Sequence, residues 1–252
     1  MGSSEKFGYE QSALIQAICE FRFSPSNPIS KDWDGKWYSR LLNELGKDYE
    51  MEPQQHVPLF IPQKAVDDVK KYKDFSLNRM IYKKQNTKEA LHLSPGSLAI
   101  YCDDEHDDWD SFKKQIGHAF NCLLKTITPF NLDRIGMRYL YRLHRKDRSE
   151  PLRTWICSGN LIPNRVLDQY RAFSYHCEIP KDAAAKMIVN LFEENNNERK
   201  PIILDLDFIF EKKILNDRVL IEKELDKLHS ALFQELDQII NPSLKKYLYL
   251  NH

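Results

Sequence analysis

The stretches LIQAICEFRF, residues 14–23, and LDRIGMRYLYRLH, residues 132–144, carry the pattern that decides the fold. In each stretch, residues of an apolar face alternate with residues of a more polar one, which indicates a β-strand that buries one face. The apolar face of the first stretch holds Ile15, Ala17, Cys19, Phe21 and Phe23. That of the second holds Ile135, Met137, Tyr139, Tyr141 and Leu143. Two such strands predict a sheet with one buried face and one polar face.

Each of these strands opens a similar series of elements. After the first strand we predict a helix at 37–45, strands at 77–83, 90–93 and 98–102, and a long helix at 109–127. After the second we predict strands at 170–179, 187–192 and 202–210 and a long helix at 217–240. Both long helices repeat apolar residues every three or four positions, so each has one apolar stripe. Residues 52–69 contain three prolines and are predicted as loop or edge material.

This order of elements predicts an α+β fold with a mainly antiparallel sheet and long helices packed on one face. The two series also suggest two similar halves, about residues 9–130 and 131–245, each built as strand, connection, three strands and helix. We expect residues 9–252 to form a single domain after a flexible start at residues 1–8. No glycine-rich turn joins a strand to a helix, which argues against a doubly wound nucleotide-binding fold.

The composition indicates a folded domain without a net charge. Hydrophobic residues make up 42% of the 252 residues, and 13 Phe, 12 Tyr and 4 Trp are enough to fill a sizeable core. Lys+Arg and Asp+Glu balance at 37 each, so charge does not draw the whole protein to nucleic acid or membranes. The five cysteines form no Cys-x-x-Cys pair and are expected to be free thiols. Without a secretory signal or an apolar membrane span, we expect a cytoplasmic protein.

The polar faces of the two opening strands form the candidate binding site. Its residues are Glu20, Arg22, Arg134, Arg138 and Arg142. If the two strands lie side by side at the sheet centre, Glu20 meets Arg134 or Arg138 across the strands, and opposite charges stabilise such pairs. Arginine side chains also bind phosphate and carboxylate groups in a fork geometry.

Two interpretations of this face stay open. In the first, it binds a partner protein, a nucleic acid or a small anionic ligand. In the second, it is a solvated sheet face held by ion pairs, and Asp205 and Asp207 of a later strand neutralise the arginines.

Motifs for catalysis or metal binding are weak. The eight histidines form no His-x-x-x-His pair and no cluster with cysteine, so we expect no metal and no cofactor. The acidic run at residues 103–108 is predicted as a solvated loop before a helix, with a hard-cation site as its alternative. Asp205 and Asp207 share one strand face, as the carboxylates of metal-dependent phosphodiesterases do. A metal-dependent nuclease or other hydrolase is therefore the alternative function. His229 is predicted to be a partly buried helix residue bonded to a neighbour.

Four stretches, in this order, resemble an uncharacterised, sporadically distributed prokaryotic protein family. They are Ala17–Phe23, Trp109–Phe112, Arg134–Tyr139, and Leu225–His229 with Phe233. The resemblance marks four positions, which are Glu20, Arg134, Arg138 and Tyr139. It implies a bacterial accessory protein of the kind found among mobile or defence-associated genes, and it brings no activity, cofactor or catalytic residue. The family's strand continues into an Asn after Arg-Tyr, whereas this chain continues with Leu140, so a role for that Asn does not carry over.

We therefore expect a non-enzymatic binding module of a bacterial cytoplasmic system, such as phage defence or a toxin–antitoxin-like pair. The favoured partner is a protein, with nucleic acid or a small anionic ligand as alternatives. An oligomer that joins sheet edges is a third hypothesis.

Overall fold

The computed structural model describes residues 13–24, 36–53, 80–94, 96–103, 109–127, 131–143, 151–157, 162, 174–194, 201–213 and 218–242. These residues form one antiparallel nine-stranded sheet and three α-helices, so the predicted α+β class is confirmed. The predictions for residues 1–8 and 54–69, and for 104–108 of the acidic run, lie outside the described residues.

The observed elements follow the two predicted series closely. The first series comprises β1 (Leu14–Phe23), α1 (Lys36–Leu45), β2 (Tyr49–Pro53), β3 (Met80–Lys84), β4 (Glu89–Ser94), β5 (Ser97–Asp103) and α3 (Trp109–Thr126). The second comprises β6 (Leu132–Leu143), the short 3-10 helix η4 (Leu152–Thr154), β7 (Ser174–Pro180), β8 (Ala185–Glu193), β9 (Ile202–Phe210) and α5 (Arg218–Ile239). Strand β2 was not predicted as a strand, because its sequence YEMEP is short and ends in a proline, although Tyr49 and Met51 alternate with two glutamates.

The two opening strands pair at the centre of the sheet. The strand order is β2-β3-β4-β5-β1-β6-β9-β8-β7, and β1 runs antiparallel to β6. Ile18 lies opposite Arg138, Glu20 opposite Gly136, and Arg22 opposite Arg134. The predicted central pairing is therefore present, and each series of strands extends to one side of it. The internal duplication stays a hypothesis.

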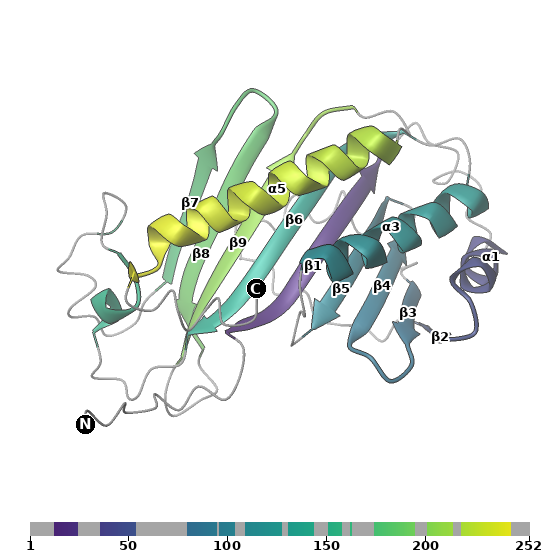
Figure 1. The fold of residues 1–252 in the computed structure, drawn as a ribbon, viewed down its shortest axis with the longest axis horizontal. Helices are drawn as coiled ribbons and strands as arrows, with labels where there is room; N and C mark the ends of the chain where they lie inside the picture. The colour runs from purple at the N-terminus through teal and green to yellow at the C-terminus, as the bar shows by residue number, and fades with distance from the viewer. Residues whose placement is uncertain are drawn as a thin grey trace, which may run out of the picture.

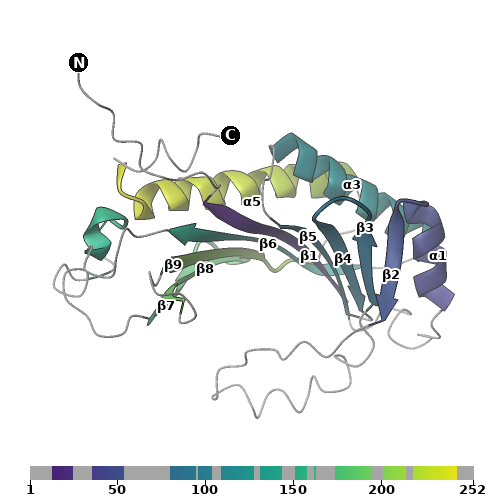
Figure 2. The ribbon, with the colours of Figure 1, turned by 90° about the horizontal axis from the view of Figure 1, so that it is seen from below.

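Both long helices pack on the same face of the sheet (Figures 1 and 2). Helix α3 buries Phe112, Ile116, Phe120 and Leu123, and helix α5 buries Ile221, Leu225, Leu228, Leu232, Leu236 and Ile239. The fully buried Phe21 of β1 contacts Phe120 of α3, with ring centroids 4.9 Å apart. Gly46 follows α1 with a φ of +99°, a conformation that glycine adopts without steric cost at a helix end.

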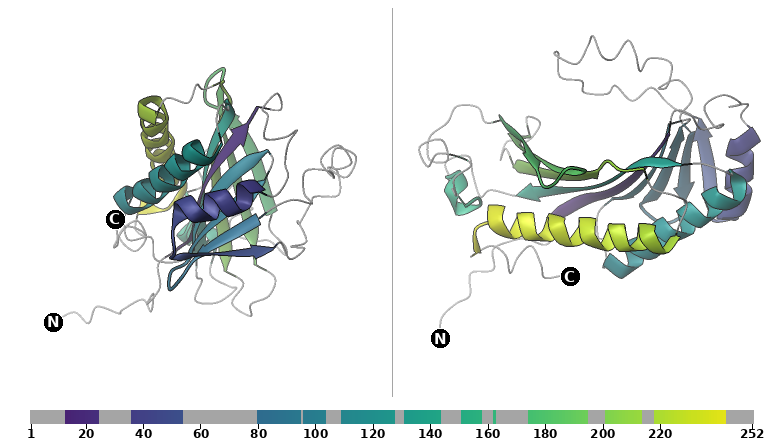
Figure 3. Two further views of the ribbon diagram at one scale, coloured as in Figure 1. Left: turned by 90° about the vertical axis from the view of Figure 1, so that its right-hand side faces the viewer. Right: turned by 90° about the horizontal axis from the view of Figure 1, so that it is seen from above.

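The sheet is strongly curved, and both of its ends bend away from the helices (Figure 3). The described helices thus lie on the convex face, and the opposite face of the sheet is concave. Among the described residues, none of the helices combines the length and the apolar character needed to cross a bilayer.

An aromatic cluster fixes the helix layer to the central strand β6. The hydroxyl of Tyr139 lies 2.8 Å from Nδ1 of His229 in α5. The indole of Trp109, at the start of α3, stacks on the His229 ring with centroids 4.1 Å apart, and Phe233 packs against the same imidazole. The predicted bonding of His229 to a neighbour is confirmed. The cluster also joins four residues from the family-like stretches.

The Tyr139–His229 hydrogen bond predicts that the effect of Tyr139→Phe on stability changes sign when His229 is also replaced. Tyr139 is only 2% exposed, so His229→Phe leaves its buried hydroxyl without this partner, at a cost of about 1–3 kcal/mol. Tyr139→Phe should therefore destabilise the wild-type protein but stabilise the His229→Phe variant. Urea unfolding of the four proteins measures both effects. An equal effect of Tyr139→Phe in the two backgrounds would contradict the prediction.

Candidate functional site

The concave face carries all five residues predicted for binding. Glu20 and Arg22 project from β1, and Arg134, Arg138 and Arg142 project from β6, because period two places these positions opposite the buried face. The neighbouring strand β9 adds Asp205 and Asp207, and β8 adds Asn190. We call the side of β1, β6, β9, β8 and β7 that lies opposite helices α3 and α5 the polar face.

On one side of the polar face, charges alternate between β1, β6 and β9. Nε of Arg22 donates to Oε2 of Glu20 at 3.0 Å. Nη2 of Arg134 lies 3.6 Å from the same Glu20 oxygen and 4.0 Å from Oδ2 of Asp207. The predicted contact of Glu20 with the arginines of the second strand is therefore present, and the residue it meets is Arg134.

Arg138 instead binds Asp205, which lies almost completely buried on β9. Its Nε and Nη2 donate to Oδ1 and Oδ2 of Asp205 at 2.7 and 2.8 Å, a bidentate geometry. Nδ2 of Asn190 donates to Oδ2 of Asp205 at 2.9 Å, and Oδ1 of Asn190 lies 2.6 Å from Nδ1 of His176. These contacts extend the chain of polar interactions to β7.

We call these residues the polar network: Glu20, Arg22, Arg134, Arg138, His176, Asn190, Asp205 and Asp207. It crosses five neighbouring strands and balances three arginines against three carboxylates. Arg142 stands apart from it and donates to Oε1 of Glu194 at 3.0 Å. Asp205 and Asp207 thus meet two of the predicted arginines, Arg138 and Arg134. The other two, Arg22 and Arg142, pair with Glu20 and Glu194.

The guanidinium of Arg134 passes close to Gly136. A Cβ at this glycine would lie 3.6 Å from Nη2 of Arg134 and 3.8 Å from Oδ1 of Asp207, which are ordinary contact distances. Nε of Arg134 is buried and has no hydrogen-bond partner among the described residues. Arg134 is thus held mainly by the charges of Glu20 and Asp207 rather than by short hydrogen bonds.

The carboxyl group of Asp207 has an unusually high pKa. Burial raises its pKa to about 6, although the nearby Arg134 and Arg138 oppose this shift and Asp205 and Glu20 add to it. In contrast, the hydrogen bond to Asp205 raises the pKa of Arg138, so this guanidinium keeps its charge. The polar network therefore contains a carboxyl group that titrates close to neutral pH.

Asn190 and His176 are members of the network that sequence reasoning missed. Both lie on strands whose polar faces alternate regularly, but a lone Asn or His on such a face is ordinary. Only the register that places Asn190 opposite Asp205 identifies their roles.

The geometry gives no support to the hydrolase hypothesis. Asp205 already accepts hydrogen bonds from Arg138 and Asn190. Within the described ranges, no three His, Cys, Asp or Glu side chains lie close enough to hold a metal ion. The pair His176 and Cys177 points to opposite faces of β7, and all five cysteines are free thiols.

No family model and no curated protein matches this sequence. The resemblance to a prokaryotic family therefore stays an expectation that rests on the quoted stretches.

Asp207 predicts a pH dependence of stability. Its pKa is about 6 in the folded protein and near 3.8 in the unfolded chain, so its contribution to stability is largest below pH 3.8 and is lost as the pH rises through 6. The Asp207→Asn variant has no carboxyl group at this position, so it does not lose stability through this group as the pH rises. The unfolding free energy of the variant minus that of wild type should rise by about 1–3 kcal/mol between pH 4 and pH 7. A difference that stays constant across this range, measured by urea unfolding, would contradict the assignment.

A second prediction separates the two types of arginine on the face. Arg138→Met leaves the buried Asp205 carboxylate with only Asn190 and should cost about 3–5 kcal/mol of unfolding free energy. Arg142→Met, the matched control on the same strand, breaks a partly exposed pair and should cost about 1 kcal/mol or less. Equal losses in chemical unfolding would show that the Asp205 contact is not structurally important.

Proposed function

We propose that this protein is a binding module that recognises a partner protein on its polar face. The observation that carries the proposal is the balanced charge of this open, concave surface. Three arginines face three carboxylates in the polar network. A surface for nucleic acid needs an excess of positive charge to neutralise phosphates. The balance therefore favours a protein partner over a nucleic acid.

The exposed part of the face has the composition of a protein interface. The side chains of Arg22 and Arg138 are 48% and 43% exposed, and Phe192 of β8 is 38% exposed on the same side of the sheet. Leu140 and Ile188 lie between them and are partly exposed. Aromatic residues and arginine are enriched at the centres of protein interfaces, where they contribute most of the binding free energy.

The polar network also supports binding because it fixes these side chains in advance. The two hydrogen bonds to Asp205 hold Arg138, and Glu20 holds Arg22. A side chain that is already ordered loses less conformational entropy when a partner binds. The resemblance to a family of bacterial accessory proteins adds the expectation of a defence-related or toxin–antitoxin-like setting, which the genes beside this one would test.

The binding test uses Phe192 rather than Arg134 or Arg138, because replacing those arginines also disturbs folding. Phe192→Ser should weaken partner binding at least about tenfold, as loss of an interface anchor does. Val219→Ser is the matched control, since Val219 is 74% exposed on helix α5 of the opposite layer, and it should leave binding unchanged.

The measurement starts with extract of the native host, of which one half is treated with nuclease and the other is left untreated. Proteins retained by wild type and by Val219→Ser, but not by Phe192→Ser, are purified, and their dissociation constants are measured against all three proteins. Retention of nucleic acid with a steep salt dependence, or equal retention by all three proteins, would overturn the proposal.

A further inference from the structure

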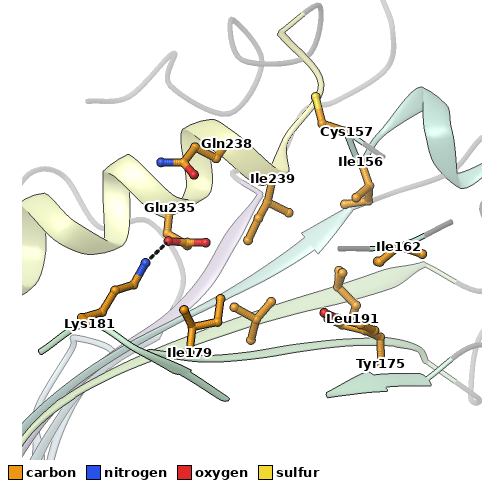
Figure 4. Close-up of a pocket in the computed structure, with 11 residues that line it drawn as sticks. Ile156, Cys157, Ile162, Tyr175, Ile179, Lys181, Leu191, Glu235, Gln238 and Ile239 are labelled. Atoms are coloured by element: carbon orange, nitrogen blue, oxygen red, sulfur yellow. Dashed lines mark hydrogen bonds and ion pairs between the residues drawn. The ribbon is translucent and has the colours of Figure 1, made fainter. Parts of the chain in front are cut away.

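A cavity of about 350 Å³ lies on the opposite side of β8, under the carboxyl end of helix α5. Figure 4 shows its wall, which combines three parts of the chain. Strands β7 and β8 contribute Tyr175, Ile179, Val189 and Leu191, and α5 contributes Glu235 and Ile239. The segment after η4 closes one end with Ile156 and Cys157, and Ile156 forms a β-bridge to Ile240 directly after α5.

The cavity lies beside the edge strand β7, whose helix side the described helices cover only in part. Helix α5 packs on β6 and β9, so the helix-side residues of β7 are only partly covered. The uncovered strip is the apolar floor of the cavity.

One ion pair interrupts this apolar lining. Nζ of Lys181 donates to Oε2 of Glu235 at 2.6 Å, and the Glu235 side chain is only 7% exposed (Figure 4). Among the described residues, Lys181 is the one hydrogen-bond donor to this carboxylate, so its second oxygen is available to accept another bond. Burial, together with a side-chain hydrogen bond with Cys177, raises the pKa of Tyr175 to about 12, so its hydroxyl is neutral at pH 7. The cavity therefore has no net charge.

We propose that this cavity binds a neutral, largely apolar small molecule that carries a hydroxyl group, and that the hydroxyl donates a hydrogen bond to Glu235. The volume lies in the range of small-molecule sites, which are mostly apolar with a few polar groups that orient the ligand. An anionic ligand would meet the Glu235 carboxylate, and a cationic one would compete with Lys181 for it. A neutral donor instead completes the hydrogen bonding of the buried carboxylate without separating the ion pair.

This site is independent of the polar face. Val189 and Leu191 line the cavity, whereas Asn190 and Phe192 of the same strand project to the concave side. Adjacent strand residues point to opposite faces, so a variant on one face can leave the other intact. Failure of one proposal therefore does not imply failure of the other.

The probes are 2-naphthol and naphthalene, which differ by the hydroxyl group alone. A cavity of about 150 Å³ accepts benzene, so one of this size has room for two fused rings. Dissociation constants are measured on the full chain by fluorescence titration and ligand-observed NMR. We expect the wild-type protein to bind 2-naphthol at least about tenfold more tightly than naphthalene, because a hydrogen bond to a charged group contributes about 1.5–3 kcal/mol.

Four variants make the test specific. Glu235→Met should lower the affinity for 2-naphthol about tenfold, to the level of naphthalene, and leave that of naphthalene unchanged. Glu222→Met, the matched control on the same helix, and Phe192→Ala on the polar face should change neither affinity. Ile179→Trp, at the partly covered edge strand, should fill the cavity and abolish binding of both probes.

Unfolding curves of each variant establish that it is folded before binding is measured. If Ile179→Trp does not fold, Tyr175→Trp replaces it. The proposal is wrong if neither probe binds saturably below about 1 mM. It is also wrong if the two probes bind equally to wild type, or if Glu235→Met keeps the preference for 2-naphthol.

Discussion

The antiparallel pairing of β1 with β6 is the constraint on which the rest of the structure depends. Both strands are buried on the helix side and polar on the other, so a slip of either strand by one residue would move all of its side chains to the wrong face. A slip of β1 would move Phe21 out of the core. A slip of β6 would move Met137 out of the core and bring Arg134 and Arg138 into it. The cost of burying unpaired arginines enforces the observed register, and this register sets the positions of all outer strands and both long helices.

The polar network follows from this register. Glu20 stands opposite Gly136, and Arg134 lies between the carboxylates of β1 and β9. Asp205 is buried on the face opposite the described helices, because Arg138 and Asn190 bond to it from both neighbouring strands. Buried charges of this type need complete pairing. The network therefore has a structural role whether or not a partner binds, and only its exposed arginines, with Phe192, are free to contribute to recognition.

The two faces of β8 illustrate how one strand serves two environments. Its concave side joins the polar network through Asn190, and its helix side lines an apolar cavity through Val189 and Leu191. The cavity lies where helix α5 packs on β6 and β9 and leaves the helix side of the edge strand β7 partly uncovered. A helical wheel places Glu235 beside the core stripe of α5. In the structure its carboxylate lines this cavity and pairs with Lys181, which directly follows β7.

The sequence by itself determined the element types, the central strands and the face on which Glu20, Arg22, Arg134, Arg138 and Arg142 lie, because period two and the helical repeat are local properties of the chain. It did not determine which carboxylate each arginine meets, the edge strand β2, the role of Asn190, or the cavity beside Glu235. Only the tertiary structure decided these. They depend on strand order and register between segments that lie far apart in the chain, such as Arg138 and Asp205, and no local pattern encodes that alignment.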